Sequence, residues 1–107
     1  MNVNYTDSVK QWPDGYELAQ KATNRLKEVL GKSEDKVSAE WGLTVDDRGR
    51  QVFSLRLNDP TGESERKITP DDLRETHRTA FHLHRVYGDL LQSGSEKLLK
   101  ELIGEEG

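Results

Sequence analysis

The order of hydrophobic and polar residues after position 12 predicts a first helix. Apolar residues recur at intervals of three and four, at Ala19, Ala22, Leu26, Val29 and Leu30. This spacing places them on one face of an α-helix. Asp14 is a suitable N-cap, and Gly31 can take the left-handed conformation that ends many helices. The pattern therefore predicts a helix between Asp14 and Gly31, followed by a charged connector over 32–36.

The next segment, 37–57, predicts a β-hairpin, because two runs alternate apolar and polar residues around the turn sequence Asp-Asp-Arg-Gly-Arg. A two-residue turn would place the two apolar rows on opposite faces of the hairpin. A three-residue loop, Asp47 to Gly49, with Gly49 in the left-handed conformation, places both rows on one face. That register pairs Leu43 with Phe53, Trp41 with Leu55, Ala39 with Leu57 and Glu40 with Arg56.

The remaining elements complete an α+β prediction. Residues 63–68 form at best a weak third strand, and because a two-stranded sheet is marginal alone, either this segment or pairing across a dimer must extend it. Thr69 as N-cap and Pro70 at the first helical position predict a long helix to about Ser93. Ser93-Gly94-Ser95 should break it before a short C-terminal helix. Helices are expected on one face of the sheet, and residues 1–11 and 104–107 as flexible tails of a single domain, 1–107.

Composition narrows the class of protein. The 107 residues are 32% hydrophobic and 34% charged, which predicts one small domain with a thin core. The net charge of −4 disfavours a dedicated nucleic-acid binder, whose surface is usually basic. The absence of cysteine excludes disulfides and thiolate chemistry. No apolar run is long enough to span a membrane, and the N-terminus lacks signal-peptide character, so a cytoplasmic location is expected.

A heptad pattern in the predicted long helix marks a candidate dimer or core seam. Its members are Leu73, His77, Ala80, His84, Tyr87 and Leu91, and Leu98 continues the same spacing. The alternatives are a core helix and a helix that meets a second copy of the chain. We favour a homodimer, because the small sheet leaves apolar surface without an evident cover.

The two seam histidines do not predict a metal site. His77 and His84 would lie about 10.5 Å apart along the helix axis, too far to ligate one metal ion within a chain. A metal ion would need further ligands from a partner chain. We favour neutral, hydrogen-bonded histidines in the seam, and the alternatives are an interface that responds to pH and a metal ion shared with a partner chain.

A basic stripe on the other side of this helix is a candidate anion patch. It consists of Arg74, Arg78, His82 and Arg85, at intervals of four, four and three. It could contact phosphates or an acidic partner. The alternative is a solvated face in which Arg85 pairs with Asp89 and Arg78 with Glu75.

No arrangement of residues predicts catalysis or a cofactor. His82 and Asp89 are seven residues apart on one helix and cannot form a hydrogen-bonded pair. The Ser-Gly-Ser sequence does not follow a strand, as a nucleophile elbow requires, and no glycine-rich phosphate loop is present. The sequence therefore predicts a non-enzymatic protein–protein interaction or adaptor module, expected as a homodimer. A nucleic-acid-associated protein that uses the basic stripe is the alternative.

Overall fold

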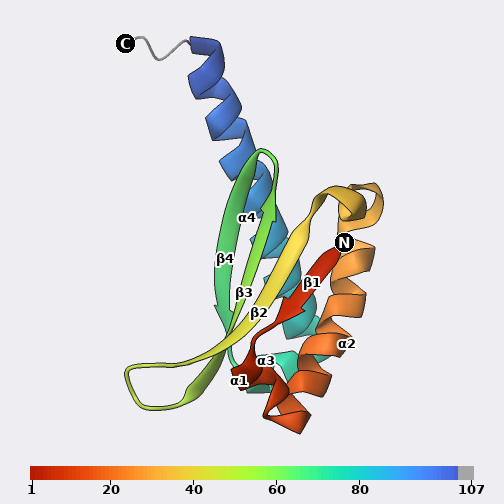
Figure 1. Ribbon diagram of the computed structural model, residues 1–107, viewed down its shortest axis with the longest axis vertical. Coiled ribbons are helices and arrows are strands. Elements are labelled where there is room, and N and C mark those ends of the chain that lie inside the picture. The colour runs from red at the N-terminus through yellow and green to blue at the C-terminus, as the bar shows by residue number, and fades with distance from the viewer. Residues whose placement is uncertain (104–107) are drawn as a thin grey trace.

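The computed structural model describes residues 1–103, which form a four-stranded sheet with helices on one face (Figure 1). The elements in chain order are β1 (Asn2–Tyr5), α1 (Asp7–Lys10), α2 (Pro13–Leu30), the 3₁₀ helix η1 (Gly31–Lys36), β2 (Ser38–Val45), β3 (Gln51–Asp59), β4 (Gly62–Ile68), α3 (Pro70–Arg74) and α4 (Thr76–Ile103). The strand order is β1-β2-β3-β4. The α+β prediction is confirmed. The tail expected at 104–107 lies outside the described residues.

The hairpin register is as predicted. Leu43 pairs with Phe53, Trp41 with Leu55, Ala39 with Leu57 and Glu40 with Arg56. Gly49 has a φ of 79°, and its N–H donates to the carbonyl of Asp46 at 3.0 Å. The Asp46 carboxylate closes the loop by accepting from the backbone N–H groups of Arg50 and Arg48, each at 2.9 Å. These hydrogen bonds, that of Arg50 foremost, lower the pKa of Asp46.

The sheet is wider than predicted. Residues 62–68 form β4, antiparallel to β3, so the expected weak strand is present. Residues 1–11, expected to be a flexible tail, instead form β1 and α1, and Val9 is fully buried. Strand β1 runs parallel to β2, with Tyr5 opposite Trp41. The parallel direction follows from α2, because a helical crossover returns the chain to the starting end of the sheet.

Trp41 lies in the core rather than at the surface. Its side chain is completely buried, and its Nε1 donates a 2.9 Å hydrogen bond to Oγ1 of Thr23 on α2. The same hydroxyl accepts from the Tyr5 hydroxyl at 3.1 Å and donates to the carbonyl of Ala19 at 2.8 Å. The buried hydrophobic cluster comprises Val9, Ala19, Ala22, Leu26, Leu30, Val37, Ala39, Trp41, Phe53, Leu55, Leu57, Ile68, Leu73, Leu83, Val86 and Leu90.

The first long helix begins one residue earlier than its expected cap. Trp12 is the N-cap of α2, Pro13 occupies the first turn, and Asp14 lies inside the helix as a first-turn acid rather than capping it. Gly31 ends α2 with a positive φ of 56°, as predicted, but its ψ of −123° differs from that of the left-handed helical conformation. The charged connector expected over 32–36 is the 3₁₀ helix η1.

The helix predicted from Pro70 to about Ser93 is two helices. Thr69 caps α3 as expected, accepting from the N–H of Asp72 at 3.2 Å. Glu75 then takes an extended conformation, with φ −110° and ψ 122°. Its carboxylate accepts from the backbone N–H groups of His77 at 3.0 Å and Arg78 at 3.1 Å. Glu75 therefore caps α4, and the break places the buried Leu73 on a separate helix, α3.

The break predicted at Ser93-Gly94-Ser95 does not occur, because α4 is continuous to Ile103 and no separate C-terminal helix exists in the described chain. Gly94 is buried against the β3–β4 turn. A Cβ atom there would lie 2.6 Å from Oγ1 of Thr61, and one on Gly62 would lie 2.6 Å from Oγ of Ser93. The two glycines therefore allow this turn to lie directly on α4.

Candidate functional site

The predicted seam does not form the core face of α4. The side chains that α4 buries are Thr79, Leu83, Val86 and Leu90. Leu73 is buried but belongs to α3, Ala80 and Tyr87 are half-buried, and His77, His84 and Leu91 are exposed. The buried line of α4, at intervals of four and three, begins at Thr79 and lies beside the predicted seam. Leu73 is separated from the rest of the seam because α3 ends at Arg74. The Tyr87 hydroxyl donates to Oγ of Ser33 at 3.1 Å and ties α4 to η1.

The exposed end of the seam continues as a row of leucines on α4. Leu91, Leu98 and Leu102 are 52%, 50% and 82% exposed. Their intervals of seven and four place them within about 40° around the helix axis, since each residue turns it by about 100°. We call these three residues the leucine stripe. Leu99, at 56% exposure, lies beside it.

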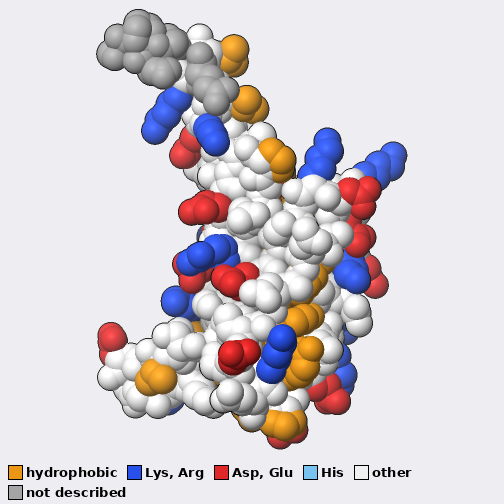
Figure 2. All heavy atoms as spheres, in the orientation of Figure 1, with side chains coloured by type: hydrophobic (Ala, Val, Ile, Leu, Met, Phe, Trp, Pro, Cys, Tyr) orange, Lys and Arg blue, Asp and Glu red, His pale blue; other side chains and the backbone are white. Residues whose placement is uncertain are grey.

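This end of α4 extends beyond the sheet (Figure 1). The helix has 28 residues, about 42 Å at 1.5 Å per residue, whereas the seven residues of β4 reach about 23 Å. Gly94 contacts the turn at the end of the sheet, so α4 leaves the sheet after this residue. Figure 2 shows hydrophobic side chains in a row along the projecting segment. Leucines 98, 99 and 102 therefore lie where no other described element packs.

Two arginines of the predicted anion patch are paired with carboxylates. Nη1 of Arg74 lies 2.8 Å from Oδ1 of Asp71. Nη1 of Arg78 lies 3.3 Å from Oδ1 of Asp72, and its Nε lies 3.8 Å from Oε2 of Glu75. The pairing of Arg78 with Glu75 is as expected. These carboxylates neutralise the half of the stripe nearest α3.

His82 links β4, α3 and α4. Its Nε2 lies 2.8 Å from Oδ2 of Asp72, and its Nδ1 accepts a 2.7 Å hydrogen bond from Nε of Arg66. Because a guanidinium can only donate, Nδ1 carries no proton, and Nε2–H donates to Asp72. The hydrogen bond from His82, together with the ion pair with Arg78, lowers the pKa of Asp72.

Arg85 makes a contact that the sequence analysis did not predict. Among the described residues it forms no ion pair with Asp89 or any other carboxylate. Its guanidinium carbon lies 5.8 Å from the ring centroid of Phe81, and that of Arg66 lies 5.6 Å from the same centroid. Phe81 is 56% exposed. We call Arg66, Phe81 and Arg85 the arginine–phenylalanine cluster.

Two members of this cluster, Arg66 and Phe81, are not predicted from the sequence, although the sequence contains a signal for each. Phe81 precedes Arg85 by four residues, an interval that brings helical side chains together. Arg66 alternates with the outward-facing Glu65 and Lys67, so once β4 is paired, its side chain must point toward the helices. Neither signal identifies the strand and helix as neighbours, because their contact depends on the turn from β4 into α3.

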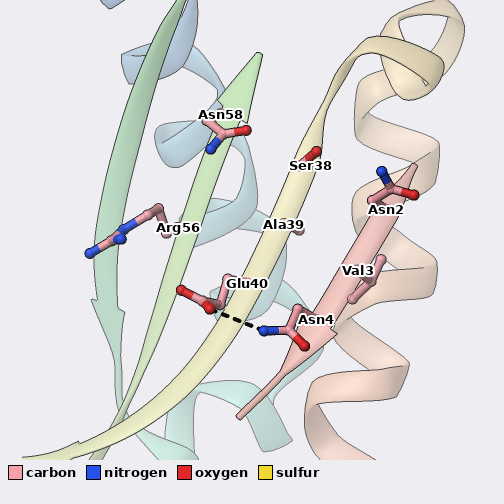
Figure 3. Close-up of a pocket in the computed structure, with 8 residues that line it drawn as sticks. All are labelled: Asn2, Val3, Asn4, Ser38, Ala39, Glu40, Arg56 and Asn58. Atoms are coloured by element: carbon pink, nitrogen blue, oxygen red, sulfur yellow. Dashed lines mark hydrogen bonds between the residues drawn. The ribbon is translucent and has the colours of Figure 1, made fainter.

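The face of the sheet opposite the helices is polar and contains a hollow of about 260 Å³ (Figure 3). Its lining comprises Asn2, Val3, Asn4, Ser38, Ala39, Glu40, Arg56 and Asn58. Nδ2 of Asn4 donates to Oε2 of Glu40 at 3.1 Å, and Nη2 of Arg56 lies 3.9 Å from Oε1 of Glu65. The charged groups of the hollow thus have protein partners, and its lining offers no aromatic ring on which a ligand could stack.

Among the side chains that the structure describes, no three from His, Asp or Glu come together as metal ligands. None of the helices within residues 1–103 combines the length and the apolar content that a bilayer span requires. No protein-family model, curated protein or solved structure matches the chain.

Proposed function

We infer that this protein is a non-enzymatic protein–protein interaction module that self-associates through the leucine stripe of α4. The observation that carries the proposal is the exposure of Leu91, Leu98 and Leu102 on a helix that extends past its own sheet. Such a row of large apolar side chains on a projecting helix is typical of helix-mediated association.

Association of two stripes would contribute a favourable free energy, because it buries large apolar side chains. Fully burying one leucine side chain contributes about 1.5–3 kcal/mol relative to leaving it exposed. In a twofold dimer every stripe residue is buried twice, because the same patch serves both copies. Gly88, one turn before the stripe, would carry a Cβ with no atom within 4 Å, so this side of α4 is open to a neighbouring helix.

The charge distribution supports this proposal over the nucleic-acid alternative. Arg74 and Arg78, half of the predicted anion patch, have carboxylate partners. The whole chain carries a net charge of −4. A protein that neutralises a run of phosphates needs a continuous basic surface, and here carboxylates interrupt it.

Sedimentation equilibrium of wild type and a Leu98→Asn/Leu102→Asn variant tests the proposal. We expect a dimer for wild type and at least a tenfold weaker dimer for the variant. Val45→Asn is the matched control, since Val45 is 61% exposed at the far end of the hairpin and should leave the dimer unchanged. A wild-type dimer that the leucine variant does not weaken would refute the role of the stripe.

A further inference from the structure

We propose that the arginine–phenylalanine cluster recognises an acidic segment of a partner protein. Its two guanidinium groups would bind carboxylates, and the Phe81 ring would contact an apolar side chain next to them. This site goes beyond the self-association proposed above. It lies on the part of α4 that packs against β4, and the leucine stripe lies on the projecting part.

The two guanidinium groups are available to a ligand. Within the described residues neither Arg66 nor Arg85 has a carboxylate within 4 Å, whereas the nearby Arg74 and Arg78 do. Arg66 uses Nε to bond His82, which leaves its four Nη hydrogens. Arginine with unengaged donors binds carboxylates through short, charge-assisted hydrogen bonds.

Arg66 is also held in place before any ligand arrives. The Asp72 carboxylate fixes the His82 ring through a 2.8 Å contact, and the ring fixes Arg66 through a 2.7 Å hydrogen bond. Arginine side chains lose considerable rotamer freedom when they are ordered. Because the fold has already restricted this side chain, binding an anion costs less entropy. His82 is therefore a positioning residue for Arg66.

Phe81 gives the site an apolar component. Phe81 is 56% exposed, and the guanidinium groups of Arg66 on β4 and Arg85 on α4 both lie over its ring. The cation–π contacts keep positive charge beside an accessible apolar surface. A ligand that fits both features carries negative charges next to an apolar side chain.

An acidic protein segment satisfies this description better than a nucleic acid. Two guanidinium groups suffice for one or two carboxylates, whereas proteins that bind DNA through its backbone neutralise a run of phosphates. The residues that would lengthen the basic row, Arg74 and Arg78, are neutralised by Asp71, Asp72 and Glu75. The charge on the cluster is therefore local.

The test uses ¹⁵N-labelled full-length protein and two labelled probes, a peptide of four glutamates around a central leucine and the oligonucleotide dodecathymidylate. We expect the peptide to shift the Nε–H signals of Arg66 and Arg85 in a saturable manner. Arg66→Gln and Arg85→Gln should each weaken peptide binding, measured by fluorescence anisotropy, by about tenfold. Arg25→Gln is the matched control, since Arg25 is an exposed arginine on α2 and should have no effect.

Two further variants separate the roles within the site. Phe81→Ala should weaken binding of the leucine-containing peptide and leave a glycine-centred peptide unaffected. His82→Ala should broaden the Arg66 Nε–H signal, leave that of Arg85 in place, and weaken binding. The proposal is overturned if millimolar peptide moves neither arginine signal, if both arginine variants bind as wild type does, or if the oligonucleotide binds more tightly than the peptide. The Leu98→Asn/Leu102→Asn variant should bind the peptide normally, so loss of self-association does not imitate failure of this site.

Discussion

Nε of Arg66 on β4 lies 2.7 Å from Nδ1 of His82 on α4, and this hydrogen bond is one of three that join the edge strand of the sheet to the helix that covers it. The imidazole is in turn hydrogen-bonded to Asp72 of α3. One side chain thus connects three elements at the point where the chain turns from strand to helix. The same side chain that stabilises this corner also orients the proposed site for acidic segments.

Removing the imidazole should destabilise this corner of the fold. His82→Ala leaves the partly buried donor of Arg66 and the Asp72 carboxylate without their shared partner. We expect the free energy of unfolding to fall by about 1–3 kcal/mol, the usual cost of losing hydrogen bonds that involve charged groups. Urea denaturation at neutral pH measures this value. A His82→Ala variant as stable as wild type would mean that water replaces the ring at no cost.

The hydroxyl of Thr23 should contribute more to the free energy of unfolding than its methyl group does. Thr23→Val leaves Nε1 of the buried Trp41 without an acceptor, so the free energy of unfolding should decrease by about 1–3 kcal/mol. Thr23→Ser keeps the hydroxyl and should cost clearly less. Urea titrations followed by tryptophan fluorescence compare the two. Equal losses in both variants would contradict the importance of this hydrogen bond.

Replacing Gly88 and Gly94 of α4 with alanine should change the free energy of unfolding in opposite directions. Gly94→Ala would place a Cβ 2.6 Å from Thr61, so overpacking should lower the free energy of unfolding by about 1–3 kcal/mol. Gly88→Ala meets no atom within 4 Å and should raise it by about 0.8–1 kcal/mol through helix propensity. Thermal unfolding at one protein concentration distinguishes them. Stabilisation by both substitutions would show that the turn does not press on α4.

The Glu75 cap should make stability sensitive to acid. Hydrogen bonds from the backbone N–H of His77, and then of Arg78, lower the pKa of Glu75 below its usual 4.5. Since the folded pKa is the lower one, the carboxylate stabilises the fold above about 4.5, and this contribution disappears as the pH falls through the folded pKa. Glu75→Gln should therefore lower Tm at neutral pH, and its Tm should converge on that of wild type in acid. Parallel curves of Tm against pH would refute the cap.

The sequence was sufficient for features that depend on local alternation. The parity of the apolar rows determined the hairpin register, including the pairing of Trp41 with Leu55, because only one loop length places both rows on the same face. The sequence also predicts Thr69 as an N-cap and Gly31 as a helix end, since a helix cap depends on a few neighbouring residues.

The sequence was insufficient where contacts between distant segments decide the structure. Strand β1 has only four residues, and its pairing depends on the return of the chain through α2. Local sequence predicts a helix break at Gly94, but glycine is required there because Thr61, in the turn between β3 and β4, packs against it. Leu73 does not share a helix with the rest of the predicted seam, because Glu75, an uncommon N-cap, separates α3 from α4.

The candidate sites, too, could be predicted from the sequence only where they depend on local spacing. The leucine stripe follows from helical spacing, and Leu91 and Leu98 were both on the predicted seam. The arginine–phenylalanine cluster could not be predicted as a unit, because Arg66 reaches Phe81 only through the packing of β4 on α4. Of the predicted anion patch, only Arg85 belongs to it.

Solution mass tests the central claim, self-association through the leucine stripe, most directly. Size-exclusion chromatography with light scattering across a range of concentrations should give a mass that rises toward twice 12.2 kDa for wild type. The Leu98→Asn/Leu102→Asn variant should remain near 12.2 kDa over the same range. A wild-type mass of 12.2 kDa at every concentration would contradict self-association.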